Sequence, residues 1–157
     1  MSTHWAKEIL RNKIHQSCTQ DLSQNFKDYA CVALLVRGEA ANPELGFIVR
    51  AHNPQDRWSG QIAFPGGRRE LLDKNDIHTA IRETFEEIGL RLFESDLLGK
   101  LNDVQARKGI QMLEFYIRPF VFYVSDEATL KLNPSEVADF FWHRLADLKN
   151  LSFQSFI

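Results

Sequence analysis

Residues 82–90 constrain this chain more than any other stretch, because they place three acidic side chains at helical spacing. Glu83, Glu86 and Glu87 stand at i, i+3 and i+4, so on a helix their carboxylates share one face, about 5–6 Å apart. Like charges at these spacings destabilise a helix by about 0.2–0.5 kcal/mol per pair. A hard divalent cation removes that repulsion, because Mg²⁺ and Mn²⁺ prefer carboxylate oxygens. The spacing therefore predicts a metal site for Mg²⁺ or Mn²⁺, with these three glutamates as ligands.

Acid-rich helix faces are commonly solvated surface, so the sequence around the glutamates has to decide between the two interpretations. Gly66 and Gly67 precede the helix and let the backbone approach a ligand closely. Gly89 follows the glutamates directly, where a glycine commonly ends a helix. Asp76 is expected to cap the start of the helix. A turn, a short acidic loop, and a helix with a defined start and end together favour a built site.

The same segment resembles the Nudix box, whose pattern is Gly-x5-Glu-x7-Arg-Glu-U-x-Glu-Glu-x-Gly-U, with U a bulky aliphatic residue. Asp73 stands where the pattern has its first Glu, eight residues instead of seven separate it from the arginine, and Thr84 replaces an aliphatic. Residues 60–67, Gly-Gln-Ile-Ala-Phe-Pro-Gly-Gly, resemble the coenzyme A pyrophosphatase-like branch, although Trp58-Ser59 stands where that branch often has His. The positions that match the second half of the box are Arg82, Glu83, Glu86, Glu87, Gly89 and Leu90.

The resemblance implies a fold of the α/β (α+β) class: an α/β/α sandwich with a mixed sheet between helices and a loop-helix-loop box at about residues 66–90. It also implies metal-dependent hydrolysis of a nucleoside diphosphate derivative. Glu83 and Glu87 would be direct metal ligands, with Glu86 as a third or water-mediated one. Arg82 would be structural, paired with either Asp73 or Glu70, and the sequence leaves that choice open.

Catalysis and substrate binding are assigned to residues in and around the box. Glu83 and Glu86 are candidates for proton transfer, as is Glu136, which precedes Trp142 in a late turn and is otherwise ordinary turn surface. Phosphate contacts are expected from arginines, whose guanidinium groups suit phosphate oxygens, with solvated charge as the alternative. The predicted substrate contacts are Arg50, Gln61, Gly66, Gly67 and Arg68, and Arg57 and Arg69 are further candidates.

Hydrophobic patterning predicts one domain over residues 1–157, with an N-terminal helix at about residues 4–17. Buried strands are expected at residues 29–36 and 45–51, followed by strands at 97–104, 112–124 and 136–142 and a basic turn at 106–111. Pro119 predicts a bulge, an edge or a break in the fourth of these strands. The box helix is expected to bury Ile77, Ala80, Ile81, Thr84, Phe85 and Ile88 against the sheet.

The formal net charge of −2 and a pI near 6.2 give no positive field that would indicate nucleic acid binding. Cys18 and Cys31 have no metal-ligand spacing, and idle thiols in a reducing compartment are favoured over a disulfide. No apolar run is as long as the roughly 20 residues needed to span a bilayer, so a soluble, cytoplasmic protein is expected. A homodimer is left open.

Three functions follow from these observations. The leading one is a pyrophosphohydrolase of coenzyme A or an acyl-CoA that releases phosphopantetheine and 3′,5′-ADP. The second is the same chemistry on another small-molecule nucleotide: ADP-ribose, a dinucleoside polyphosphate, NADH or an oxidised nucleotide. The third is a non-catalytic nucleotide-binding module.

Overall fold

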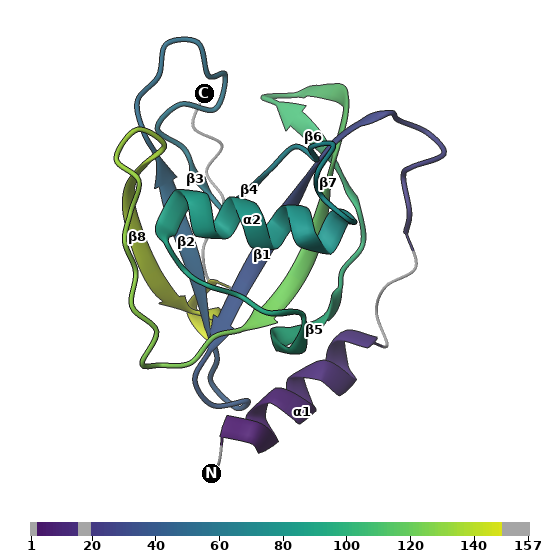
Figure 1. Ribbon diagram of the computed structural model, residues 1–157. Helices are drawn as coiled ribbons and strands as arrows, with labels where there is room; N and C mark the ends of the chain where they lie inside the picture. The colour runs from purple at the N-terminus through teal and green to yellow at the C-terminus, as the bar shows by residue number, and fades with distance from the viewer. Residues whose placement is uncertain (1–2, 16–19, 149–157) are drawn as a thin grey trace.

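The computed structural model describes residues 3–15 and 20–148 of the chain (Figure 1). One mixed sheet contains all eight strands of these described residues, and its main path runs in the order β3-β2-β1-β7-β5. The remaining strands pair with members of this path: β4 with β1, β6 with β7, and β8 with β2. The strands are β1 (Asp28–Arg37), β2 (Glu44–Arg50), β3 (Ile62–Ala63), β4 (Gly66–Gly67), β5 (Leu97–Lys100), β6 (Val104–Lys108), β7 (Gln111–Tyr123) and β8 (Val137–Arg144). The helices are α1 (Thr3–His15), α2 (Asp76–Ile88), η1 (Glu94–Asp96) and α3 (Leu145–Leu148).

Strands β1 and β7 form the centre of the sheet and its one parallel pair among the described residues. Their register runs from Asp28 opposite Phe115 to Val36 opposite Tyr123. A strand covered on both faces reads as a continuous apolar run, which is why residues 29–36 lack the alternation of a half-exposed strand.

The two helices α2 and α1 pack on opposite faces of this centre, which gives the predicted α/β/α sandwich. Figure 1 shows α2 lying across the front of the sheet. Alternate residues of β1 show the division, since successive side chains of a strand point to opposite faces. Ala33 and Leu35 pack with Ala80 and Ile88 of α2, whereas Leu34 and Val36 pack on the side of α1.

The start and the exposed face of α2 differ from the prediction. Asn75, not Asp76, is the N-cap, because its side chain accepts a hydrogen bond from the amide of His78. Phe85 is 48% exposed, and Thr79 is buried in its place, so the core-facing stripe is rotated from the predicted one. Gly89 ends the helix with φ 66° and donates to the Phe85 carbonyl, as expected.

Residues 64–67 are not a free turn, because Gly66 and Gly67 pair with β1 as the short strand β4. The pairing brings backbone against backbone: a Cβ at Gly66 would collide with the carbonyl oxygen of Cys31. The glycines therefore allow β4 to lie between β1 and α2.

Of the bulge, edge or break predicted at Pro119, the break is wrong, since β7 runs unbroken through it. The carbonyl of Pro119 accepts from Leu101, on the edge where the partner of β7 changes from β5 to β6, so its missing N–H interrupts no ladder there. The change of partner also corrects the predicted strand at 97–104, which is two strands. The predicted basic turn at 106–111 lies mostly in β6 and β7, with Gly109 and Ile110 forming the actual turn.

At the N-terminus, α1 matches the predicted helix to within one residue at its start, and residues 16 and 17 lie outside the described part. Cys31 is a buried free thiol, and Cys18 also lies outside the described residues. Within residues 3–15 and 20–148, no helix is long and apolar enough to cross a membrane.

Candidate active site

Strand β4 brings two of the three predicted metal ligands against the sheet. The Gly66 amide donates to Glu87 Oε2 at 2.9 Å, and Gly67 lies directly against the carboxylate of Glu83. Glu87 is only 3% exposed, although it belongs to the charged face of the helix. The spacing of one helical turn between Glu83 and Glu87 thus places both carboxylates along two consecutive glycines.

The two glycines give a prediction that separates fold from site. In Gly67→Ala the new methyl group would occupy the place of the Glu83 carboxylate, a movable side-chain end, so we expect little loss of stability but about 10- to 100-fold weaker Mn²⁺ binding. In Gly66→Ala the methyl group would meet the Cys31 backbone, and we expect a loss of about 2–4 kcal/mol in stability. Thermal unfolding and calorimetric Mn²⁺ titration of both variants check this; equal Mn²⁺ affinity in wild type and Gly67→Ala would contradict it.

Burial and mutual repulsion weaken the acidity of these carboxyl groups. Burial, opposed by the hydrogen bond from Gly66 and assisted by the negative charges of Glu83 and Glu136, raises the pKa of Glu87 to about 8. Burial also raises the pKa of Glu83, and Glu86 and Glu136 add to that shift. The turn that carries Glu136 contacts the box helix, because the Asn133 amide donates to the Glu87 carbonyl at 2.8 Å, and Asn133 Nδ2 donates to Glu136 Oε1 at 3.0 Å.

Arg82 joins the box loop to the helix. Its guanidinium donates to both oxygens of Asp73, at 2.9 and 3.0 Å, whereas Glu70 is exposed and no closer than 3.8 Å. The pairing left open by the sequence is thus with Asp73. The hydrogen bond from Arg82 lowers the pKa of Asp73 to about 2. The same guanidinium contacts Glu83 at 3.0 Å and Glu86 at 2.9 Å.

The charges at this junction fit a divalent cation. Arg82 contacts three carboxylates, those of Asp73, Glu83 and Glu86. Glu87, which binds the Gly66 amide instead, is a fourth acidic group at this junction. Acidic oxygens in such excess are the donors that hard cations prefer. As they stand, no three His, Cys, Asp or Glu side chains of residues 3–15 and 20–148 form a complete ligand set. The reason is visible at Glu86, whose half-exposed carboxylate is turned to Arg82.

A cavity of about 1060 Å³ opens on the other side of β4. Its floor is formed by Ala30, Val32 and Ile117. These residues lie on the same face of the sheet as α1, at a part of that face that α1 does not cover. None of the helix glutamates lines it, but the backbone of Gly66 and Gly67 does. The thickness of one backbone strand therefore separates the cavity from Glu83 and Glu87.

All five predicted substrate contacts line this cavity: Arg50, Gln61, Gly66, Gly67 and Arg68. Arg50 is not free, because it forms a 2.7 Å ion pair with Asp56, a residue that the sequence analysis missed. Arg68 lies over the ring of Phe115 at 5.1 Å. Trp58 lines the cavity beside the same phenylalanine, with their ring centroids 5.9 Å apart.

The other two candidate arginines are not in the cavity wall. Arg69 donates to the carbonyls of Asp73 and Lys74 and lies 3.4 Å from Asp76, so it contacts the box loop instead. Arg57 lies over the ring of Trp58 at 5.4 Å.

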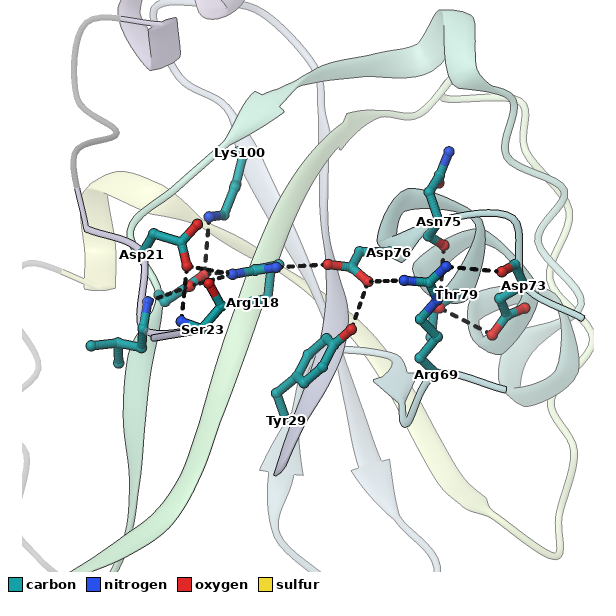
Figure 2. A network of polar contacts seen from close by, with 12 residues as sticks. Asp21, Ser23, Tyr29, Arg69, Asp73, Asn75, Asp76, Thr79, Lys100 and Arg118 are labelled. Carbon is teal, nitrogen blue, oxygen red and sulfur yellow. Dashed lines mark hydrogen bonds and ion pairs between the residues drawn. The ribbon is translucent and has the colours of Figure 1, made fainter. Parts of the chain in front are cut away.

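A polar network centred on Arg118 was not predicted (Figure 2). Arg118 joins Asp76 at the start of α2 to Asp103 between β5 and β6, and Tyr29 and Arg69 also contact Asp76. Burial alone would raise the pKa of Asp103, but the hydrogen bonds from Arg118 and Leu22 lower it. The sequence signal for the network was a lone arginine within the apolar run of β7.

Taken together, a mixed sheet between two helices and an acidic box helix against a paired Gly-Gly strand define a Nudix-type sandwich. A family model, described as NUDIX domain, matches residues 28–156, and the chain belongs to this family. The predicted family membership is confirmed. Members of the family generally use divalent metal ions.

The chain is also similar to curated proteins with longer chains. An uncharacterised Schizosaccharomyces pombe protein is 41% identical over 68% of this chain and 33% of its own length. The Mus musculus mitochondrial coenzyme A diphosphatase NUDT8 is 34% identical over 73% of this chain and 51% of its own length. The chain thus spans about half or less of these curated relatives. The NUDIX domain of Shewanella oneidensis NrtR, solved with ADP ribose, shares the fold with a TM-score of 0.59 and 17% identity over 79% of this chain and 77% of its own.

Proposed function

We propose that this domain hydrolyses a pyrophosphate bond in a nucleoside diphosphate derivative with the help of a divalent cation, and that its substrate is coenzyme A or an acyl-CoA. One observation carries the proposal: the two glycines of β4 border the large cavity on one side and the carboxylates of Glu83 and Glu87 on the other. A pyrophosphate seated at these glycines would lie within reach of both.

The cavity has the chemistry that such a substrate requires. Arg50 and Arg68 can bind phosphate oxygens through their guanidinium groups, and Gln61 adds an amide. Trp58, Phe115 and Met112 give an apolar wall for a base or for the pantetheine arm. Its volume of about 1060 Å³ lies at the upper end of common ligand pockets, which suits a substrate as long as coenzyme A.

Glu83 and Glu87 would be the direct ligands of Mg²⁺ or Mn²⁺, with Glu86 as the third ligand after its carboxylate leaves Arg82, or through a water. When bound, the cation would neutralise phosphate oxygens and make a bound water more acidic. Arg82 and Asp73 would fix the helix against the loop, so that the two ligands keep their spacing.

Glu136 is the proposed general base. Asn133 binds its Oε1, which leaves Oε2 to accept a proton from the attacking water. The contact between its turn and the box helix supports this assignment, because the Asn133 amide donates to the Glu87 carbonyl at 2.8 Å. Glu83 and Glu86 are the alternative proton acceptors.

A nucleotide panel with Mg²⁺ or Mn²⁺ tests the proposal. Coenzyme A or the acyl-CoA should give the highest kcat/KM among coenzyme A, an acyl-CoA, ADP-ribose, a dinucleoside polyphosphate, NADH and an oxidised nucleoside triphosphate. The products should be phosphopantetheine and 3′,5′-ADP. A higher kcat/KM for one of the last four substrates would reject the coenzyme A assignment. No turnover of any of the six substrates would reject the proposal that the domain is an enzyme. The name of the NUDT8 relative, a coenzyme A diphosphatase, supports the choice of first substrate.

A further inference from the structure

We propose that Arg118 is a positioning residue that fixes the box helix at a set distance from the substrate cavity, an inference that rests on the proposed function. Arg118 Nη1 donates to Asp76 Oδ2 at 2.7 Å, and Asp76 is the first residue of α2. Its Nε and Nη2 donate to the two oxygens of Asp103, at 3.1 and 2.8 Å, and Asp103 lines the cavity. One guanidinium thus connects the helix that carries the metal ligands to the cavity wall.

The connection is rigid because the group is enclosed. The side chain of Arg118 is 12% exposed, and that of Asp103 is completely buried. The guanidinium lies over the rings of Tyr29 and Tyr116, at 5.5 and 5.3 Å, and these two rings stack on each other. A planar group with donors in fixed directions sets the separation of its two partners, which a lysine ammonium cannot do.

Asp76 carries this restraint into the box (Figure 2). Its Oδ1 accepts from the Tyr29 hydroxyl at 2.8 Å and lies 3.4 Å from Arg69. Arg69 in turn binds the carbonyls of Asp73 and Lys74, so the loop before α2 is tied to the same carboxylate. Any shift of Asp76 would therefore move the start of α2 and, with it, the placement of Glu87 against Gly66.

The network also contains its own control. Asp21 accepts from Arg118 Nη2 at 2.8 Å on the side away from α2, and its side chain is 60% exposed. Asp21→Asn and Asp76→Asn each weaken one carboxylate partner of Arg118, but only the second affects the connection to the box helix. A merely structural Arg118 predicts similar effects on the site from both variants.

The test compares these variants in the full chain by two measurements. Calorimetric Mn²⁺ titration should show about 10-fold weaker binding for Asp76→Asn and less than about 2-fold change for Asp21→Asn. The Gly66 amide, which donates to Glu87, should shift and lose exchange protection in metal-free Asp76→Asn but not in Asp21→Asn. Arg118→Lys should reproduce Asp76→Asn in both measurements. Equal responses of the two aspartate variants, or a silent Arg118→Lys, would overturn the proposal.

Two outcomes remain distinct from a failure of the proposed function. If the wild-type protein binds no Mn²⁺, the proposed metal-dependent function is wrong. The shift and exchange protection of the Gly66 amide in the metal-free variants still test whether Arg118 positions the box helix. If Asp76→Asn does not fold, Tyr29→Phe removes one hydroxyl from Asp76 and should show the same direction of change. Its control is Tyr116→Phe, which leaves the stacked ring pair in place.

Discussion

Glu87→Gln is expected to lower kcat by at least about 100-fold and yet to stabilise the metal-free protein at alkaline pH. Glu87 is 3% exposed, and burial raises the pKa of its carboxyl to about 8. Because this folded-state pKa lies above the unfolded one, the folded protein binds the extra proton, and stability is lost as pH rises from about 4.5 to about 8. A glutamine has no charge to bury and can still accept the Gly66 N–H.

Thermal unfolding at pH 5 and pH 8.5 in the presence of a chelator measures the effect. The wild type should lose more stability than Glu87→Gln between the two pH values, with a difference of several kcal/mol. Glu86→Gln is the matched stability control, since its side chain is half-exposed and its effect on the pH dependence should be much smaller than that of Glu87→Gln. Added Mn²⁺ should raise the Tm of the wild type but not that of Glu87→Gln. An active Glu87→Gln enzyme, or one with the wild-type pH dependence, would remove Glu87 from the metal site.

Local sequence signals predicted the parts of this fold that depend on neighbouring residues. The apolar run of β1, the helical spacing of the glutamates and Gly89 at the helix end each act within one turn or one strand. Two of the arginines that line the cavity, Arg50 and Arg68, were candidates because they flank the motif in sequence, whereas Arg107 of β6 was not singled out.

The parts that were missed depend on long-range contacts. Nothing near Arg118 in the sequence indicates that it meets Asp76, 42 residues away, or Asp21, 97 residues away. An irregularity was predicted at Pro119 because a proline within a strand usually removes one hydrogen bond to the neighbouring strand. Here the missing N–H lies where the partner of β7 changes from β5 to β6, so no such bond is lost. Asn75 displaced Asp76 as the cap because Asp76 is bound by Tyr29 and Arg118 instead.

Asp73→Asn is expected to lower the free energy of unfolding by about 3 kcal/mol at neutral pH. Asp73 is 8% exposed and accepts hydrogen bonds from Arg82, Thr79 and the Glu70 amide. An asparagine has one acceptor oxygen for the fork of Arg82 and directs N–H donors at other donors, which leaves buried groups unsatisfied. Glu70→Gln is the control: its carboxylate is 64% exposed and 3.8 Å from Arg82, so a loss below about 0.5 kcal/mol is expected.

The pH dependence of the same variant identifies its cause. The Arg82 hydrogen bond lowers the pKa of Asp73 to about 2, below the unfolded value of 3.8, so its contribution is complete above about pH 5 and is lost as pH falls toward 2. Denaturant unfolding at pH 7 and pH 2.5 should therefore show a large difference between wild type and Asp73→Asn at pH 7 and a much smaller one at pH 2.5. A difference that persists at pH 2.5 would mean that the ion pair is not its source. A larger effect of Glu70→Gln than of Asp73→Asn would assign the pairing with Arg82 to Glu70, and the longer box loop would then have to be held by a surface contact.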